Sequence, residues 1–276
     1  MRIISAKEIE NAVCELFKTA AVKLPKDVYC AMKKAQKEED NTLAASVLCK
    51  LCDNATLAEK SGVPICQDTG LAFVFAEVGQ DVHIDGDFEK AVNRGVKRAY
   101  VGGKLRLSAA DPLTRQNTNT NTPAIIYTRL VKGDKIKLTA MPKGFGSENM
   151  SALKMFNPTA SIEDVKAFVT DTVKKAGANP CPPIIVGVGI GGSFDYSAFL
   201  SKKALTREVG KHNKKHAELE KELLTEINSI GIGPQGFGGK TSCLWVAVES
   251  APTHIAGLPV AVNISCHATR HVSKVL

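Results

Sequence analysis

The 276-residue sequence lacks several features that would assign it to a specialised class of protein. No apolar run approaches the roughly 18 residues of a membrane span, and the first residues contain no signal-peptide core. We therefore expect a cytoplasmic protein that does not enter a membrane. Aromatic residues make up only 5% of the chain, and no nucleic-acid-binding motif accompanies its net charge of +8, so we expect no nucleic-acid partner. An anionic metabolite or an acidic partner subunit would suit the excess positive charge.

The eight cysteines do not form the pattern of a disulfide framework or a zinc finger. Disulfide frameworks belong to small secreted domains, whereas a chain in a reducing compartment uses cysteines as buried, catalytic or metal-binding residues. Cys49 and Cys52 form a C-x-x-C pair in a helical, apolar-rich segment without a second pair at metal spacing, so we expect structural thiols. Cys14, Cys30 and Cys243 are expected to be small core residues.

Three further cysteines have neighbouring residues that favour exposure of the thiol or that are polar themselves. Cys66 lies in ICQDTG, Cys181 in NPCPP and Cys266 in ISCHATRH. They are so far apart in sequence that they could meet only through tertiary structure. Three thiolates on a four-iron cluster leave one iron without a protein ligand, and that iron can act as a Lewis acid.

Hydrophobic periodicity predicts a mixed α/β fold with a helical N-terminal part, organised as one domain over residues 1–276. Ser5 and Glu8 form one capping box before a helical pattern, and Ser161 and Asp164 form another. Further helices are expected at 42–60, 88–101, from about residue 196 and at 207–228. Strands are expected at 71–78, 124–131, 135–141, 184–188, 243–250 and 258–265.

Two glycine-rich segments are similar to phosphate-binding loops but depart from the required patterns. Gly187, Gly189 and Gly192 match G-x-G-x-x-G between a predicted strand and helix. The nearest acidic residue at ribose-binding spacing, Glu208, lies in a charged helix, so a nucleotide site is the weaker interpretation. Free N–H groups at that helix start would equally hold a carboxylate or cluster sulfides. The segment GIGPQGFGGKTS has Pro234 where an ATP-binding loop needs its first glycine, which leaves a tight turn or a rigid approach to an anion.

The histidines offer one weak and one stronger site candidate. His212 and the histidine four residues later are spaced for one helix face, but lysines surround them, so we expect a solvated face rather than a metal pair. His254 alone would be considered structural. Its position twelve residues before Cys266, across a strand, could place both residues at neighbouring edges of one site.

Together these segments resemble the class I fumarase and L-tartrate dehydratase family. The resemblance is to its α subunit, or to the N-terminal domain of its single-chain members, and it extends from about residue 43 to 271. It is specific for the family but not for the substrate. The motifs that carry it, in order, are ICQDTG, KLRLS, KGFGSEN, NPCPP, GIGGSFD, GPQGFGGK and SCHATRH. The resemblance implies the mixed α/β iron–sulfur hydro-lyase N-terminal domain.

The resemblance also implies an oxygen-sensitive 4Fe–4S cluster. Its ligands would be Cys66, Cys181 and Cys266, and its fourth iron would bind the hydroxyl and a carboxylate of a 2-hydroxy dicarboxylate substrate. Gln67 and Asp68 would lie beside the first ligand, with Gln67 contacting the substrate.

The resemblance further implies roles in substrate binding and proton transfer. Arg106 in KLRLS would bind a substrate carboxylate, because the planar guanidinium pairs with two carboxylate oxygens. The backbone at Gly144 or Gly146 would support it. His254, hydrogen-bonded to Asp68, would manage the proton of the departing hydroxyl.

A separately encoded β subunit is implied as a partner. Single-chain members continue into a smaller C-terminal domain that supplies further carboxylate-binding residues and the base for the carbon-bound proton, whereas this sequence ends at Leu276. We therefore expect an α2β2 assembly, with this chain catalytically incomplete alone. The SCHATRH ending also differs from the SCSADR-like form of fumarases.

The first functional hypothesis is the α subunit of fumarate hydratase, which interconverts malate and fumarate in the tricarboxylic acid cycle. L-tartrate dehydratase is the nearest alternative. A non-catalytic iron–sulfur protein is a rival of another class, and it would need a fully ligated cluster that changes oxidation state. A nucleotide-binding regulatory module is a third hypothesis, based on the G-x-G-x-x-G segment alone.

Overall fold

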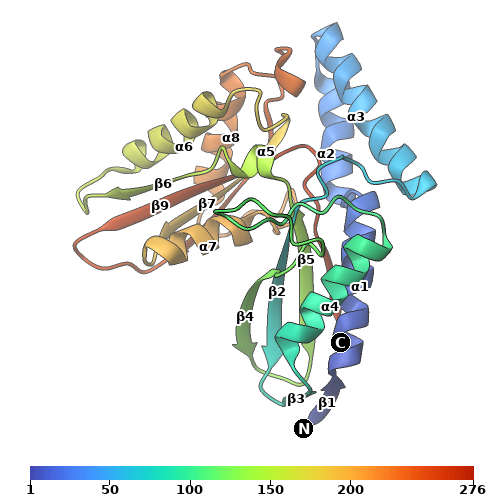
Figure 1. The fold of residues 1–276 in the computed structure, drawn as a ribbon. Coiled ribbons are helices and arrows are strands. Elements are labelled where there is room, and N and C mark those ends of the chain that lie inside the picture. The colour runs from blue at the N-terminus through green and yellow to red at the C-terminus, as the bar shows by residue number, and fades with distance from the viewer. The chain divides into compact units, whose positions relative to one another are not determined.

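The computed structural model describes all 276 residues, which form two compact units (Figure 1). Unit 1 comprises Met1–Pro25, Ala55–Phe145 and Arg270–Leu276, and unit 2 comprises Lys26–Asn54 and Gly146–Thr269. Both units combine helices with mixed sheets, which confirms the predicted mixed α/β class. The single domain expected over the whole chain stays a prediction, and each unit is described by itself. No helix has both the length and the apolar character needed to cross a lipid bilayer.

Unit 1 is built on a four-stranded mixed sheet. Its elements are β1 (Arg2–Ser5), α1 (Ala6–Val22), β2 (Leu71–Gly79), β3 (Val82–Asp85), α4 (Phe88–Gly102), β4 (Ile125–Val131), β5 (Ile136–Lys143) and β10 (Val272–Val275). The strand order is β10-β5-β2-β4, with β2 parallel to β4 and antiparallel to β5. The helices α1 and α4 pack side by side, and α1 packs on β5 (Figure 1).

Local sequence signals account for the core of unit 1. The Ser5 hydroxyl accepts the Glu8 N–H, and the Glu8 carboxylate accepts the Ser5 N–H, so the predicted capping box begins α1. The apolar stripe of α1, which includes Val13 and Phe17, belongs to one hydrophobic cluster with alternate residues of β2 such as Val74. The core thus combines helix residues spaced three or four apart with every second residue of the strand.

Unit 2 is a second four-stranded sheet with helices on both faces. Its elements are α2 (Lys26–Glu38), β6 (Ala152–Phe156), α6 (Ile162–Ala176), β7 (Ile184–Gly191), α7 (Phe194–Ala204), α8 (Ala217–Ser229), β8 (Cys243–Ala251) and β9 (Leu258–Ser265). The strand order is β6-β9-β7-β8, and only β7 and β8 run parallel. The predicted capping box of Ser161 and Asp164 begins α6. Two elements cross the boundary in sequence: α3 (Thr42–Ser61) and the short α5 (Phe145–Glu148).

The glycines of the G-x-G-x-x-G segment have a packing role in unit 2. Gly187 and Gly189 lie inside β7, on the face opposite Val186 and Val188. A Cβ on Gly187 would lie 2.1 Å from a backbone oxygen of α7, and a Cβ on Gly189 would also lie 2.1 Å from one. Only glycine permits this approach of helix to strand, so the contact explains the first two glycines of the motif without a nucleotide.

The charged segment before α8 is not helical as expected. The helix begins at Ala217, and the preceding ten residues form turns. The buried carboxylate of Glu220 accepts hydrogen bonds from Arg207 and lies 2.8 Å from Nδ1 of His212, and His216 contacts the hydroxyl of Ser250 at 2.7 Å. The prediction of a solvated histidine face was wrong, because Glu220 draws this segment onto the sheet.

Glu10 joins the two helices of unit 1. Its carboxylate on α1 accepts hydrogen bonds from Arg94 Nε at 3.1 Å and from Arg98 Nη1 at 2.5 Å, both on α4. The hydrogen bond from Lys7, together with those from Arg98 and Arg94, lowers the pKa of Glu10 from 4.5 to about 2. Folding therefore favours the ionised carboxylate.

This pKa shift gives the fold a testable pH dependence. A lowered carboxyl pKa stabilises the fold above pH 4.5, and the stabilisation is lost as the pH falls through about 2. We predict that Glu10→Gln lowers the free energy of unfolding at neutral pH by roughly 2 kcal/mol, allowing for screening of the half-exposed arginines. Urea unfolding at a series of pH values would measure it. Glu15 lies on the same helix as Glu10 and forms an exposed ion pair with Lys274 of β10, so Glu15→Gln serves as control. Equal losses in both variants would contradict the prediction.

Candidate active site

The first of the predicted cluster ligands lies on the loop between α3 and β2 in unit 1. Cys66 is half-buried, and its Sγ is 3.4 Å from Oε1 of the exposed Gln67. The preceding residue, Ile65, is buried, and its N–H donates to the carbonyl of Ala21 at the end of α1. The loop is thus anchored by Ile65, with Cys66 half-buried and Gln67 exposed after it.

Asp68 has a carboxylate whose position is fixed by backbone groups. Oδ1 accepts the Gly70 N–H at 3.0 Å, and Oδ2 accepts the Phe145 N–H at 2.9 Å. A Cβ on Gly144 would lie 3.1 Å from Oδ2, so the glycine permits this close approach. The carbonyl of Asp68 accepts a hydrogen bond from Nη2 of Arg270 at 2.8 Å. The structure therefore brings the predicted residues Asp68 and Gly144 together.

Arg106 lies in the KLRLS segment that follows α4, and its backbone is tied to the same loop. Its carbonyl accepts a hydrogen bond from the hydroxyl of the buried Thr69 at 3.0 Å. The guanidinium of Arg106 is on an exposed residue and pairs with no acidic side chain. Unit 1 thus holds five of the predicted site residues on connected segments: Cys66, Gln67, Asp68, Arg106 and Gly144.

Unit 2 brings the other two predicted ligands onto neighbouring loops. Cys181 is exposed, with a left-handed backbone (φ 55°), after a turn in which its N–H donates to the carbonyl of Ala178 at 3.0 Å. Its own carbonyl accepts the N–H of His267 at 3.3 Å and lies 3.0 Å from Nδ1 of that ring. Because His267 follows Cys266, these contacts hold the two cysteine loops side by side.

The GPQGFGGK loop reinforces this arrangement. The backbone N–H and the side-chain amide of Gln235 both donate to the carbonyl of Pro182, at 2.8 and 2.6 Å, and the amide lies 3.2 Å from Nδ1 of His267. Lys240 is paired with Asp40, and its N–H donates to Glu39. This loop therefore supports the cysteine loops through Gln235, while its lysine is neutralised by acidic side chains.

His254 lies on the exposed turn between β8 and β9 in unit 2. Its Nδ1 accepts the N–H of Ala256 at 3.1 Å, so the neutral ring carries its proton on Nε2. The neighbouring Thr253 hydroxyl donates to the carbonyl of Gly192 at 2.9 Å, which ties the turn to the GIGGSFD segment. Gly146 is exposed on α5, also in unit 2. The pairing of His254 with Asp68 joins residues of different units and stays a prediction.

Three of the other five cysteines differ from the predicted ligands in burial. Cys14, Cys52 and Cys243 are buried, and burial raises the pKa of Cys243 to about 12. Cys49 is half-buried on α3. Cys30 is exposed on α2, so the expectation that it lies in the core was wrong.

A cluster requires thiols that can lose their protons and reach inorganic iron, and the partly exposed loop thiols fit that chemistry. No group of three or more His, Cys, Asp or Glu side chains is arranged to hold a metal ion. Cys66 belongs to unit 1 and the other two ligands to unit 2, so the convergence of the three sulfur atoms stays a prediction.

Buried charges around the glycine segments were missed by sequence reasoning. Lys143 is 2% exposed, and its ammonium donates to the carbonyl of Gly144 at 3.2 Å. Lys202 on α7 forms an ion pair with Glu148, whose other oxygen accepts from the Asn263 amide at 3.2 Å. Burial lowers the pKa of Lys202. The charged residues that flank the glycines in KGFGSEN were the only sequence signal for these buried charges. Their partners are remote in sequence, so the sequence did not show which groups they would meet.

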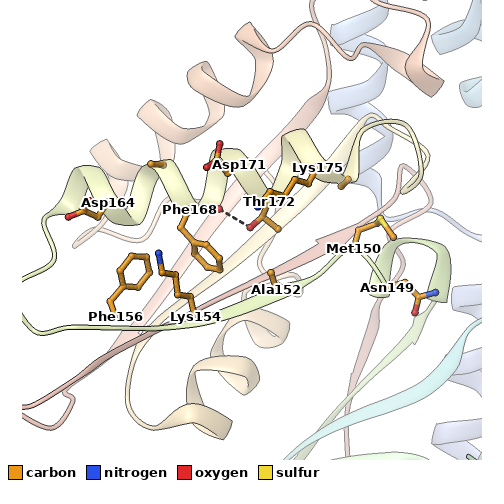
Figure 2. Close-up of a pocket in the computed structure, with 12 residues that line it drawn as sticks. Asn149, Met150, Ala152, Lys154, Phe156, Asp164, Phe168, Asp171, Thr172 and Lys175 are labelled. Carbon is orange, nitrogen blue, oxygen red and sulfur yellow. Dashed lines mark hydrogen bonds between the residues drawn. The ribbon is translucent and has the colours of Figure 1, made fainter.

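Unit 2 also contains a cavity of about 510 Å³ that is lined by a different set of residues. Figure 2 shows it between β6 and α6, with Lys154, Phe156 and Phe168 turned toward one another. The ammonium of Lys154 lies 4.3 Å from the ring centroid of Phe156. None of the predicted site residues lines this cavity, so it is not assigned to the candidate active site.

Comparisons with known proteins place these motifs in a family. The family model described as fumarate hydratase (Fumerase) matches residues 10–275. A chain of Methanocaldococcus jannaschii, provisionally named L(+)-tartrate dehydratase subunit alpha, is 43% identical over 276 residues, 97% of each chain. The L(+)-tartrate dehydratase subunit alpha of Escherichia coli strain UTI89 is 31% identical over 272 residues, 96% of this chain and 90% of the relative. The corresponding chain of strain K12 is 30% identical over the same length.

The burial of the cysteines predicts their order of reaction with an alkylating agent. In the reduced, cluster-free chain we expect Cys181 to react at a rate similar to that of exposed Cys30, and at least about tenfold faster than Cys14, Cys52 or Cys243, which are buried. Mass spectrometry of peptides after timed exposure to iodoacetamide measures these rates. Reaction of Cys181 as slow as that of Cys243 would contradict the loop geometry.

Proposed function

The chain belongs to the fumarate hydratase (Fumerase) family, and on that premise we propose that it is the α subunit of a 4Fe–4S-dependent hydro-lyase acting on L-tartrate. The observation that carries the proposal is its near full-length similarity to chains named L(+)-tartrate dehydratase subunit alpha. These names favour tartrate dehydratase over fumarate hydratase, which reverses the order of preference given by the motifs alone. Malate is the second candidate substrate, since the matching family model carries the name fumarate hydratase.

Cys66, Cys181 and Cys266 are the residues that would hold the cluster. When bound, a four-iron cluster with three protein ligands supplies a Lewis acid that polarises the C–O bond of a 2-hydroxy dicarboxylate. The proposal is supported by the neighbouring loops of Cys181 and Cys266 and by the partial exposure of Cys66.

Arg106 is proposed to bind a carboxylate of the substrate. Its exposed guanidinium pairs with no acidic side chain, and its planar shape allows two parallel hydrogen bonds to a carboxylate. Gln67 would contact the substrate from beside Cys66, and the backbone at Gly144 or Gly146 would support it. These contacts orient the 2-hydroxy acid so that its hydroxyl is presented for elimination.

Asp68 and His254 are proposed to manage the proton of the departing hydroxyl. An imidazole has two ring nitrogens, so one would pair with Asp68 and the other would serve the proton of the departing hydroxyl. Nδ1 of His254, which accepts the Ala256 N–H in this structure, would exchange that contact for one of these two roles. The carboxylate of Asp68 is already held by two backbone N–H groups, and such a fixed acceptor would orient the imidazole. The base for the carbon-bound proton is proposed to come from a β subunit.

A β subunit is the proposed partner, in an α2β2 assembly. The relatives named above are designated subunit alpha, which supports a separate second subunit. An acidic partner surface would match the net charge of +8. A non-catalytic iron–sulfur protein is the rival, and it differs in requiring the cluster to change oxidation state.

The test combines this chain with its β partner after anaerobic reconstitution with iron and sulfide. We predict water elimination from L-tartrate faster than from malate, and only with both subunits present. Cys181→Ser should lower the turnover rate by more than about 100-fold and should also lower the amount of iron bound per chain. Loss of a ligand is expected to cost more than loss of a residue that supports a ligand, which costs about 10- to 100-fold. Cys30→Ser, which alters an exposed thiol outside the site, should leave both unchanged.

Iron analysis and single-turnover kinetics measure these outcomes. Retention of full iron content and rate in Cys181→Ser would show that the ligand assignment is wrong. A complete assembly without activity on any 2-hydroxy dicarboxylate would contradict the hydro-lyase proposal itself.

A further inference from the structure

Asn121 is a fully buried residue in a loop that the sequence presents only as a polar connection. The loop lies between α4 and β4 in unit 1, and Asn121 is 0% exposed with a left-handed backbone (φ 55°). A buried amide must satisfy its donors and acceptors within the protein, because desolvation without partners is costly. The identity of those partners therefore determines what the residue does.

The amide of Asn121 connects two segments of the candidate site. Its Nδ2 donates to the carbonyl of Gly70 at 3.1 Å, at the end of the QDTG sequence. Its Oδ1 accepts the backbone N–H groups of Ser108, the last residue of KLRLS, at 2.7 Å and of Ala109, the next residue, at 3.0 Å. One side chain thus bonds to the loop of Asp68 on one side and to the segment of Arg106 on the other.

A second hydrogen bond links the same two segments. The hydroxyl of Thr69, a residue 2% exposed, donates to the carbonyl of Arg106 at 3.0 Å. Tyr100 on α4 also holds the loop, since its buried hydroxyl lies 2.8 Å from the carbonyl of Thr69 and 3.1 Å from that of Gly70. The distance between the Arg106 backbone and the Asp68 loop is therefore set by buried contacts and not by the exposed side chains.

We propose that Asn121 is a positioning residue for this reaction, which holds the Arg106 segment at a fixed distance from the Asp68 loop. The inference rests on the proposed function for the roles of Arg106 and Asp68. The guanidinium binds one end of a dicarboxylate while Asp68 acts where the hydroxyl departs, so both depend on this separation. A displacement of about 1 Å between such groups costs about 100-fold in rate.

Asn121→Asp is the sharpest variant, because it preserves size and the acceptor to Ser108 and Ala109 but places an oxygen against the carbonyl of Gly70. Asn228 in unit 2 offers a control with the same bonding pattern on a half-buried side chain. Asn228 donates from Nδ2 to the carbonyl of Cys243 at 3.1 Å and accepts the N–H groups of Ser242 and Cys243 at 2.9 and 2.8 Å. Asn228→Asp therefore disrupts the same bonding pattern at a side chain whose partners, Ser242 and Cys243, belong to neither the Arg106 segment nor the Asp68 loop.

The measurements use the reconstituted assembly with the β subunit. For each variant we would determine kcat and KM for L-tartrate, the Kd of succinate by calorimetry, iron per chain and the thermal midpoint. Succinate lacks the hydroxyl, so its binding reports on carboxylate recognition without turnover. We expect Asn121→Asp to raise KM and the succinate Kd at least about tenfold and to lower kcat/KM about 100-fold, with iron content unchanged. Asn228→Asp should lower only the thermal midpoint.

Thr69→Val and Thr69→Ser keep the inference testable if Asn121→Asp does not fold. Loss of the hydroxyl in Thr69→Val should raise KM in the same direction, and Thr69→Ser, which retains it, should restore binding. If the wild-type assembly is active and Asn121→Asp and Asn228→Asp change KM and kcat/KM equally, the positioning role is overturned. If Asn121→Asp fails to fold, an unchanged KM in Thr69→Val would overturn it as well. Absence of wild-type activity would instead overturn the proposed function.

Discussion

The close approach of Gly70 to the backbone of Lys143 is the constraint on which the site in unit 1 depends. Gly70 has φ 82°, and a Cβ there would lie 2.6 Å from the backbone nitrogen of Lys143. This approach lets the start of β2 meet the end of β5, where Leu71 pairs with Lys143. Asp68 lies three residues before the start of β2, and Gly144 directly follows the end of β5. Their proximity therefore follows from strand register and requires no long-range flexibility.

Buried polar contacts then fix what the register brings together. The carbonyls of Asp68, Thr69 and Gly70 accept hydrogen bonds from Arg270, Tyr100 and, for Gly70, also Asn121. Three consecutive carbonyls with buried donors leave the loop little freedom to move. An exposed loop of this kind would otherwise be mobile, since loops have few buried backbone bonds. The Asp68 carboxylate is thus presented on a rigid support.

The sequence allowed much of the framework to be predicted because the relevant signals are local. The capping boxes at Ser5 and Ser161 and the periodicities of α4 and β2 each depend on residues within one element. The helix α2 was not predicted, although Val28 and Met32 have the spacing of a buried helical face. The error for Cys30 follows from that omission, because its exposure is set by which face of α2 it occupies.

Features that depend on tertiary partners could not be predicted in the same way. The turns around His212 are determined by the buried carboxylate of Glu220, whose partners Arg207 and Val248 come from other segments. Asn121 appeared only as part of a polar loop, since its partners at Gly70 and Ser108 are known only from the fold. Composition and spacing indicate a turn there but not which carbonyl the amide will meet. The candidate ligands were found from sequence because prolines and polar neighbours mark Cys181 and Cys66 as loop residues.

The pairing of nearby cations distinguishes Arg106 from the lysines that lie close to the glycine motifs. Lys143 is buried against the carbonyl of Gly144, Lys202 is paired with Glu148, and Lys240 is paired with Asp40. Each of these charges near a glycine motif is already used to stabilise the protein. Arg106 differs, because its backbone is held by Thr69 while its guanidinium is exposed and pairs with no acidic side chain. A positive charge on a fixed backbone can bind an anion without first breaking an ion pair, so the free energy of the new contact is retained for binding.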